Sequence, residues 1–311
     1  MKNIEQLQTY LTEKDFSQLF ILTDDNTSKF CLPVLLEKVD ILTDRQTVLL
    51  EIPAGEENKT LNTAENIIGS LSESEADRNA CIVSLGGGVI CDLGGFVSSV
   101  YKRGIQNVNV PTTLLAMADA AIGGKTAVNH SGIKNLIGTF NFTSQVFFDA
   151  EFLSTLSSSQ IMDGIAEMLK TFVMFDYSAA EELMRIKDFT EIKRDLIVRC
   201  AEIKEKITLQ DPYDRGIRKK LNFGHTLGHA VEMFYGLSHG HSVAVGMHYA
   251  LDLSVEHAGY DKQRADKVKS FIENNYEIPD YRSDMQQLIP LMRQDKKNTD
   301  GEIKFILADG Q

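Results

Sequence analysis

Short apolar runs alternate with amphipathic segments over the first half of the chain, and most of the runs end at a turn signal. One helix-like segment, residues 62–71, lies between two of the runs. Short apolar strands that alternate with helices are typical of a parallel sheet with covered faces. We therefore predict an α/β domain with a parallel sheet, whose strands are residues 19–23, 47–52, 81–85, 108–111 and 146–149.

The pattern changes after about residue 153, where apolar residues recur at helical spacing. Residues 1–16 are also expected to be helical, and residues 303–307 form the last strand-like run. We predict two domains, an α/β domain over residues 1–155 and a mostly α-helical domain over residues 156–311. The helices expected in the second domain are residues 161–175, 179–186, 189–207, 224–235 and 242–257.

Composition narrows the kinds of partner. The net charge of −12 argues against a nucleic-acid-binding surface, but a small anionic substrate stays possible if cations gather in one pocket. No apolar run approaches the ~20 residues that a membrane span needs, and the N-terminus has no apolar signal core. The four cysteines show no C-x-x-C spacing, which favours reduced thiols. We expect a cytoplasmic protein that binds neither nucleic acid nor membrane.

A glycine-rich run, residues 86–95, follows one of the apolar strands and precedes residues 96–100, which are expected to be helical. Glycines at a strand-to-helix turn let the backbone approach a diphosphate, and a helix N-terminus favours anions. The run is not the G-x-G-x-x-G fingerprint, because Cys91 stands in place of the third glycine. Nucleotide binding and a tight structural turn are both open at this point.

Two further segments bring a lysine into a turn. Gly124, Lys125 and Thr126 resemble the end of a P-loop, but Asp119 stands where that motif needs its first glycine. A glycine turn that presents Lys125 to an anion is the favoured interpretation. Residues 53–59 combine a turn with a carboxylate and an amine; a carboxylate suits ribose hydroxyls, and a solvated loop is the alternative.

Six of the seven histidines fall between His225 and His257. His225 and His229 are four residues apart and share a helical face, and His239 and His241 follow within the same seventeen residues. The pattern is not the H-E-x-x-H motif, because Thr226 replaces its glutamate. The cluster predicts a metal site with nitrogen and oxygen ligands or an acid–base site, with buried structural histidines as the alternative.

Glu167 and Lys170 are three residues apart on a predicted helix with apolar neighbours. A carboxylate on such a helix is expected to be buried and then needs a metal or another cation. An exposed ion pair is the alternative.

Taken in order, these motifs resemble the 3-dehydroquinate synthase family of the sugar-phosphate cyclase superfamily. The resemblance runs from about residue 24 to residue 307. Its motifs are PxGExxK at 53–59, GGGVxxDLxGF at 86–96, YxRGI at 101–105, PTTLLAxxDxxxGGKTAVN at 111–129, AExxK at 166–170, RxxLNFGHTxGHAxE at 218–232 and HG at 239–240.

The resemblance implies a dehydroquinate synthase-like fold, with a Rossmann-like NAD-binding domain and a helical domain that binds a divalent metal. The metal would be Zn²⁺, with Co²⁺ as an alternative. The implied enzyme is a carbon–oxygen lyase acting on phosphates. It would convert an anionic sugar phosphate, 3-deoxy-D-arabino-heptulosonate 7-phosphate, into 3-dehydroquinate and phosphate in the shikimate pathway, with NAD used catalytically. A homodimer is also implied.

The resemblance assigns residues to each task. The metal ligands would be Glu167, His225 and His239. NAD would lie over Asp24, Asn26, Glu56, Lys59, Gly87, Gly88, Val89, Asp92, Thr112, Thr113 and Lys134. The substrate would contact Arg103, Lys125, Asn135, Arg218, Asn222, Lys296 and Lys297. The catalytic residues would be Lys170, Lys204, His229 and Asp119.

Two alternatives share much of this pattern. One is another sugar-phosphate cyclase, of the deoxy-scyllo-inosose or epi-valiolone type, and the other is a metal-dependent polyol dehydrogenase. Retention of Lys204, Arg218, Asn222 and His229 favours the substrate with a carboxylate. The chain departs from the family at His241, which replaces the glutamate of the usual HGE. We expect that histidine to alter metal affinity or the acid–base network.

Overall fold

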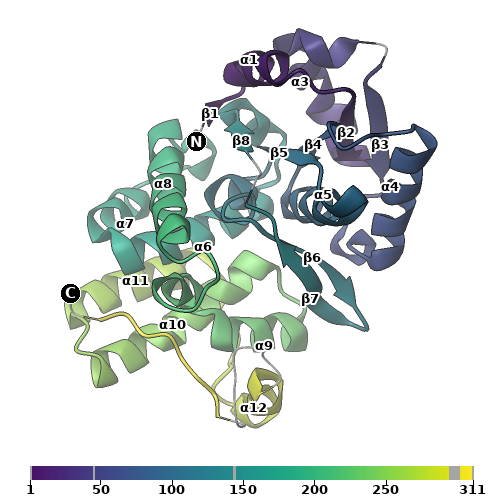
Figure 1. Ribbon diagram of the computed structural model, residues 1–311. Coiled ribbons are helices and arrows are strands. Elements are labelled where there is room, and N and C mark those ends of the chain that lie inside the picture. Colours follow the sequence, from purple (N-terminus) through teal and green to yellow (C-terminus); the bar gives the residue numbers. More distant parts are fainter. Residues whose placement is uncertain (1, 45, 143–144, 294–301, 310–311) are drawn as a thin grey trace. The chain divides into compact units, whose positions relative to one another are not determined.

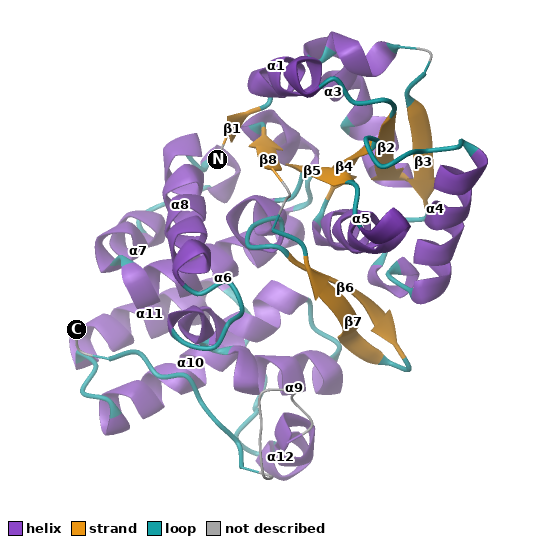
Figure 2. Cartoon of the chain, in the orientation of Figure 1, coloured by secondary structure: helices purple, strands orange, loops and turns teal. Residues whose placement is uncertain are grey.

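The computed structural model describes residues 2–44, 46–142, 145–293 and 302–309 (Figure 1). The chain forms two compact units, Met1–Ser157 and Ser158–Gln311, and each is described by itself. Figure 2 shows the described strands, in orange, within the first unit, while the second unit is built from helices, in purple. None of the described helices is both long enough and apolar enough to cross a membrane.

The first unit is built on a six-stranded parallel sheet, as the alternating pattern predicts. The spatial order is β1 (Lys2–Asn3), β8 (Gln145–Phe148), β5 (Gln106–Pro111), β4 (Cys81–Gly86), β2 (Leu19–Asp24) and β3 (Val48–Ile52). The strand order reverses direction between β2 and β4, because the chain first adds β3 on one side of β2 and then β4 on the other. In open α/β sheets, ligands bind at the carboxyl ends of the strands beside such a reversal.

The helices of this unit are α1 (Glu5–Lys14), α2 (Asp25–Phe30), α3 (Leu32–Lys38), α4 (Leu61–Glu73) and α5 (Gly88–Val100). Helix α5 begins at Gly88, directly after β4, and so includes most of the glycine-rich run expected to precede it. A Cβ at Gly94 would overlap the side chain of Ser84, and one at Gly95 would overlap Thr126. Gly94 therefore lets α5 pack closely on β4, and Gly95 lets it pack closely on residues 125–130, which form β6.

An antiparallel hairpin follows β5 and was not predicted from the sequence. It consists of β6 (Lys125–His130) and β7 (Ile133–Phe140). Lys125 begins a strand, whereas the lysine of a P-loop begins a helix, so the P-loop alternative is wrong. Of residues 1–16, expected to be helical, Glu5–Lys14 form helix α1, whereas Lys2–Asn3 form the short strand β1 and Asp15 and Phe16 follow the helix.

The second unit contains α6 (Ser158–Phe175), α7 (Tyr177–Met184), α8 (Arg194–Gln210), α9 (His225–Tyr235), α10 (His239–His257), α11 (Lys262–Asn275) and α12 (Met285–Arg293). The first five were predicted, although α8 starts later than expected, after a short 3-10 turn. The strand predicted at residues 303–307 is wrong. Ile303 and Phe305 instead pack, outside any regular element, against a core that includes Val231 and Leu288.

Helices α9 and α10 approach each other backbone to backbone. A Cβ at Gly246 of α10 would lie 1.8 Å from the carbonyl oxygen of Gly224, and one at Gly228 would lie 3.0 Å from the carbonyl oxygen of Ser242. Gly224 itself has a φ of +78°, a conformation that favours glycine, and it directly precedes α9. This glycine contact fixes the start of α9, where His225 lies, relative to α10.

Candidate active site

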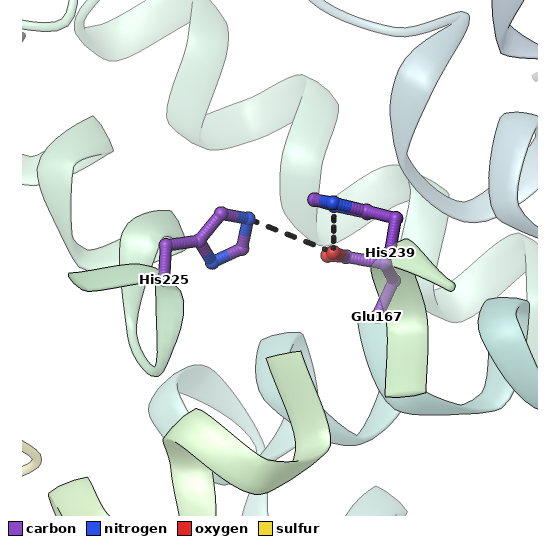
Figure 3. Close-up of side chains that lie close together, drawn as sticks. All are labelled: Glu167, His225 and His239. Atoms are coloured by element: carbon purple, nitrogen blue, oxygen red, sulfur yellow. Dashed lines mark hydrogen bonds and ion pairs between the residues drawn. The ribbon is translucent and has the colours of Figure 1, made fainter. Parts of the chain in front are cut away.

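Three side chains from three helices of the second unit meet at one point (Figure 3). Glu167 lies on α6, His225 begins α9 and His239 begins α10. Glu167 Oε1 is 3.1 Å from His239 Nε2 and 3.6 Å from His225 Nε2. The three donor atoms all lie within 4.8 Å of one another. The structure thus brings together the three residues predicted as metal ligands.

The histidine rings are held so that both Nε2 atoms face the carboxylate. His225 Nδ1 is 3.2 Å from the carbonyl oxygen of Phe223, and His239 Nδ1 is 3.3 Å from Glu232 Oε2. A carbonyl or carboxylate oxygen can only accept, so each Nδ1 carries a proton. In each ring this leaves Nε2 as the nitrogen directed at the shared point, which is the arrangement that metal-binding histidines adopt.

The charge balance at this point favours a cation. Burial alone would lower the pKa of His239, but its contacts with Glu167 and Glu232 outweigh burial and raise that pKa to about 10. The two carboxylates therefore stabilise a positive charge here, either a proton on His239 or a metal ion. Two imidazole nitrogens and one carboxylate oxygen, with further positions open, form a donor set that fits Zn²⁺ or Co²⁺.

Predicted catalytic residues surround the three ligands within the same unit. Lys170 is buried and pairs with Glu167, one turn away on α6. The ring of His229 is centred 5.2 Å from that of His225 and 6.1 Å from that of His239. Lys204 is buried on α8. The Glu167–Lys170 pair is therefore buried, which rules out the alternative of an exposed ion pair.

Two predicted substrate contacts lie on the 3-10 turn Ile217–Asn222, which leads to His225 and packs against α6 and α8. Arg218 is buried, and its guanidinium donates to the carbonyl oxygen of Pro212 over 2.7 Å. Asn222 donates to the carbonyl oxygen of Lys219 over 3.2 Å. The other two predicted contacts in this half of the chain, Lys296 and Lys297, lie outside the described residues.

Most of the predicted NAD contacts in the first unit lie at the carboxyl ends of the strands. Asp24 ends β2, Gly87 and Gly88 follow β4, and Thr112 and Thr113 follow β5. A Cβ at Gly87 would lie 3.1 Å from Thr113, and one at Gly88 would lie 3.3 Å from Ala120. The two glycines therefore let this turn pack closely on Thr113 and Ala120. The N-terminus of α5 begins here, and a helix N-terminus favours the diphosphate of a dinucleotide such as NAD.

A buried lysine connects the other predicted NAD contacts. Lys59 is 4% exposed, pairs with Asp92 of α5, and donates to Asn135 Oδ1 over 2.6 Å. Glu56 Oε1 accepts from Asn129 over 2.8 Å, and the side chain of Asn129 accepts from the backbone N–H of Asn135 over 2.8 Å. The structure thus places Asn135, predicted as a substrate contact, among predicted NAD contacts.

Several other predicted residues of the first unit lie on separate elements. Arg103 is exposed and follows the C-terminus of α5, at the end of that helix opposite to Gly88. Lys125 begins β6 and Lys134 lies on β7, and both are exposed. Asp119 lies in a π-helical turn, Ala116–Ala120, a kind of distortion that is frequent at functional sites.

Residues 49–163 match the family described as 3-dehydroquinate synthase N-terminal, and residues 164–298 match the one described as 3-dehydroquinate synthase C-terminal. A 3-dehydroquinate synthase of Parabacteroides distasonis is 38% identical over 311 residues, covering 97% of this chain and 87% of that protein. One of Campylobacter jejuni is 39% identical over 315 residues, covering 96% of this chain and 88% of that protein. The chain belongs to the 3-dehydroquinate synthase family.

A solved structure supports the same fold class. The crystal structure of 2-deoxy-scyllo-inosose synthase complexed with carbaglucose-6-phosphate, NAD⁺ and Co²⁺ matches with a TM-score of 0.81 and 25% identity. The match covers 95% of this chain and 85% of that chain. The predicted fold class, a Rossmann-like α/β domain with a helical domain, is confirmed.

Three residues at these sites escaped sequence reasoning. Glu232 lies seven residues after His225, so the spacing alone places it on the same face of α9, but nothing in the sequence reveals its contact with His239. Asn129 had only its place in the GGKTAVN motif as a signal. Asp163, one turn before Glu167, accepts from Ser238 Oγ over 2.5 Å and from the backbone N–H of His241 over 3.2 Å.

His241 does not face the metal ligands. Its Nε2 donates to the carbonyl oxygen of Glu277 over 2.6 Å, and its ring lies against that of Tyr276, 5.6 Å between centroids. These contacts of His241 therefore give no direct route to the expected effect on metal affinity or on the acid–base network. Of the remaining histidines, His248 is buried between Tyr281 and Glu273. This histidine fits the alternative of a buried structural histidine.

Proposed function

We propose that this chain is a 3-dehydroquinate synthase. The reaction would be an NAD- and metal-dependent conversion of 3-deoxy-D-arabino-heptulosonate 7-phosphate into 3-dehydroquinate and phosphate, which makes the enzyme a carbon–oxygen lyase acting on phosphates. The observation that carries the proposal is the donor set of Glu167, His225 and His239, with both Nε2 atoms directed at the carboxylate. It occurs in a chain whose relatives are 3-dehydroquinate synthases.

Glu167, His225 and His239 would hold the divalent metal and leave positions open for substrate oxygens. A metal bound there supplies a Lewis acid that polarises a substrate oxygen. Bound NAD supplies a hydride acceptor that is regenerated in the same cycle. In the first unit, we propose Asp24, Asn26, Glu56, Gly87, Gly88, Val89, Thr112, Thr113 and Lys134 as its contacts, with Lys59 and Asp92 bracing the site.

The buried cations of the second unit fit an anionic substrate. Lys170, Lys204 and Arg218 are each 7% exposed or less. Lysine and arginine side chains form charge-assisted hydrogen bonds with phosphate and carboxylate groups, and the proposed substrate carries both. The planar guanidinium of Arg218 suits a two-pronged contact with either. We propose Arg103, Lys125, Asn135, Asn222, Lys296 and Lys297 as further substrate contacts.

Proton handling falls to groups beside the ligands. The ring of His229 lies near both ligand rings without being one of the three donors, and an imidazole can both donate and accept a hydrogen bond. We therefore propose His229 as a residue that hydrogen-bonds the substrate and relays a proton. Lys170 pairs with Glu167 and is proposed as a catalytic residue together with Lys204. Asp119 is proposed as a further catalytic residue.

One assay tests the proposal. Purified protein is incubated with NAD, Zn²⁺ and the heptulosonate phosphate, and released phosphate and NADH absorbance are followed together. Phosphate release without net NADH supports the synthase. Net NADH would indicate a polyol dehydrogenase, and no phosphate release from this substrate would point to another sugar-phosphate cyclase, to be tested with glucose 6-phosphate.

We also propose that the enzyme works in the cytoplasm as a homodimer. Light scattering coupled to size-exclusion chromatography tests the oligomeric state. A mass close to twice 34.7 kDa is expected, and a mass close to that of one chain would contradict the dimer.

A further inference from the structure

Of the three metal ligands, His239 is the one that packing holds least. Its side chain is 35% exposed, against 11% for His225 and 1% for Glu167. An imidazole with that exposure has more than one accessible rotamer, and only some direct Nε2 at Glu167. Some other contact must fix the ring if the ligand set is to be preorganised.

The backbone of His239 is fixed from α6. The carboxylate of Asp163 accepts from Ser238 Oγ and from the backbone N–H of His241, on either side of His239. A Cβ at Gly240 would overlap the backbone of Asp163, so the first turn of α10 sits directly on α6. These contacts place the Cα of His239 and do not involve its ring.

The ring is fixed from α9. Glu232 Oε2 accepts from His239 Nδ1 over 3.3 Å, and the side chain of Glu232 is 10% exposed. The position corresponds to the one that the carbonyl oxygen of Phe223 occupies at His225. At His225 the backbone supplies the acceptor; at His239 a side chain does, and that side chain can be changed by mutation.

We infer that Glu232 is a positioning residue of the metal site, which holds the His239 ring with Nε2 directed at Glu167. The inference rests on the metal of the proposed function. Such partners of ligating histidines typically change metal affinity by about 10- to 100-fold when they are removed. We expect the zinc dissociation constant of Glu232→Ala to rise within this range. Glu232→Gln keeps an acceptor but loses the charge, and it should lose less affinity than Glu232→Ala.

The chain offers a matched control. Glu273 Oε1 lies 2.8 Å from Nε2 of His248, a histidine on the same helix α10 that faces Tyr281 and none of the ligands. Glu273→Ala removes a carboxylate from a histidine in the same unit without touching the site. Its zinc affinity should equal that of the parent protein.

Zinc affinity is measured by titration with Zn²⁺ against a chromophoric chelator, for the metal-free parent protein and for metal-free Glu232→Ala, Glu232→Gln and Glu273→Ala. A second titration of each protein with Co²⁺ is followed by visible absorption. Weaker binding in Glu232→Ala, a smaller loss in Glu232→Gln and parent-like binding in Glu273→Ala support the inference. Parent-like binding in Glu232→Ala overturns it, as does an equal loss in Glu273→Ala. A parent protein that binds no Zn²⁺ would refute the metal site itself, which separates the two failures. Circular dichroism of each metal-free protein checks its folding, and a misfolded Glu232→Ala leaves Glu232→Gln to decide.

Discussion

Gly246→Ala tests how the α9–α10 contact supports the ligands. The added Cβ would lie 1.8 Å from the carbonyl oxygen of Gly224 and 2.8 Å from the backbone nitrogen of Gly228. The first distance is ~1.5 Å short of an ordinary carbon–oxygen contact. Both neighbours are backbone atoms and cannot rotate away, so α9 must shift. Overpacking of a core costs about 1–3 kcal/mol, and this rigid contact belongs at the upper end.

Alanine also favours a helix over glycine by about 1 kcal/mol, which offsets part of that cost. We therefore expect a net loss of about 2 kcal/mol in the free energy of unfolding, measured by urea denaturation. Because Gly224 precedes His225, zinc affinity should fall as well. Gly69→Ala is the matched control: Gly69 lies within α4 with no atom within 4 Å of its added Cβ, so this variant should be slightly stabilised. Equal stability of Gly246→Ala and the parent protein would refute the reasoning.

Three further predictions use single substitutions. His225→Ala removes a ligand, so turnover should vanish while NAD affinity, measured by fluorescence titration, stays within about threefold of the parent value; near-normal turnover would contradict the ligand assignment. Lys59→Met removes the buried lysine of the ion pair with Asp92 and should lower the free energy of unfolding by about 3 kcal/mol, which an unchanged urea midpoint would contradict; it should also weaken NAD binding. His241→Glu should leave zinc affinity within about threefold of the parent value, because that ring contacts Glu277, and a tenfold change would restore the role expected from the sequence.

Regular elements could be predicted wherever apolar periodicity was strong. Strands β2 and β4 are largely or fully buried and read as nearly continuous apolar runs, whereas β5 is also largely buried but has only the apolar residues Val108, Val110 and Pro111. The hairpin was missed because β7 exposes Ile133 and Leu136 and so lacks the alternation of a half-buried strand. Residues 303–307 have strand-like composition, but Ile303 and Phe305 pack against the helical core outside any strand. Periodicity alone cannot distinguish a strand from an irregular segment that packs in this way.

Metal chemistry restricts residue types, so Glu167 and the histidine cluster could be recognised as candidate ligands. The choice of Glu167, His225 and His239 among them came from the resemblance to the family. Glu232 and Asp163 did not stand out, because a carboxylate on a helix is usually a solvated charge and its role here depends on contacts with a second helix. Arg103 is the opposite case: a motif marked it, but its place at the far end of α5 depends on topology that the motif does not encode.

The position of both histidine ligands raises an electrostatic question that Glu232 helps to answer. His225 and His239 are the first residues of α9 and α10, where the helix dipole is positive and disfavours a cation by about 0.3–1 kcal/mol per helix. Lys170 adds a further positive charge beside Glu167. A single carboxylate would leave a divalent cation poorly compensated among these groups. The carboxylate of Glu232 behind His239 offsets more of this positive charge. The charge of Glu232 should therefore contribute to affinity in addition to the orientation that its oxygen imposes, which is why Glu232→Gln is expected to fall between the parent protein and Glu232→Ala.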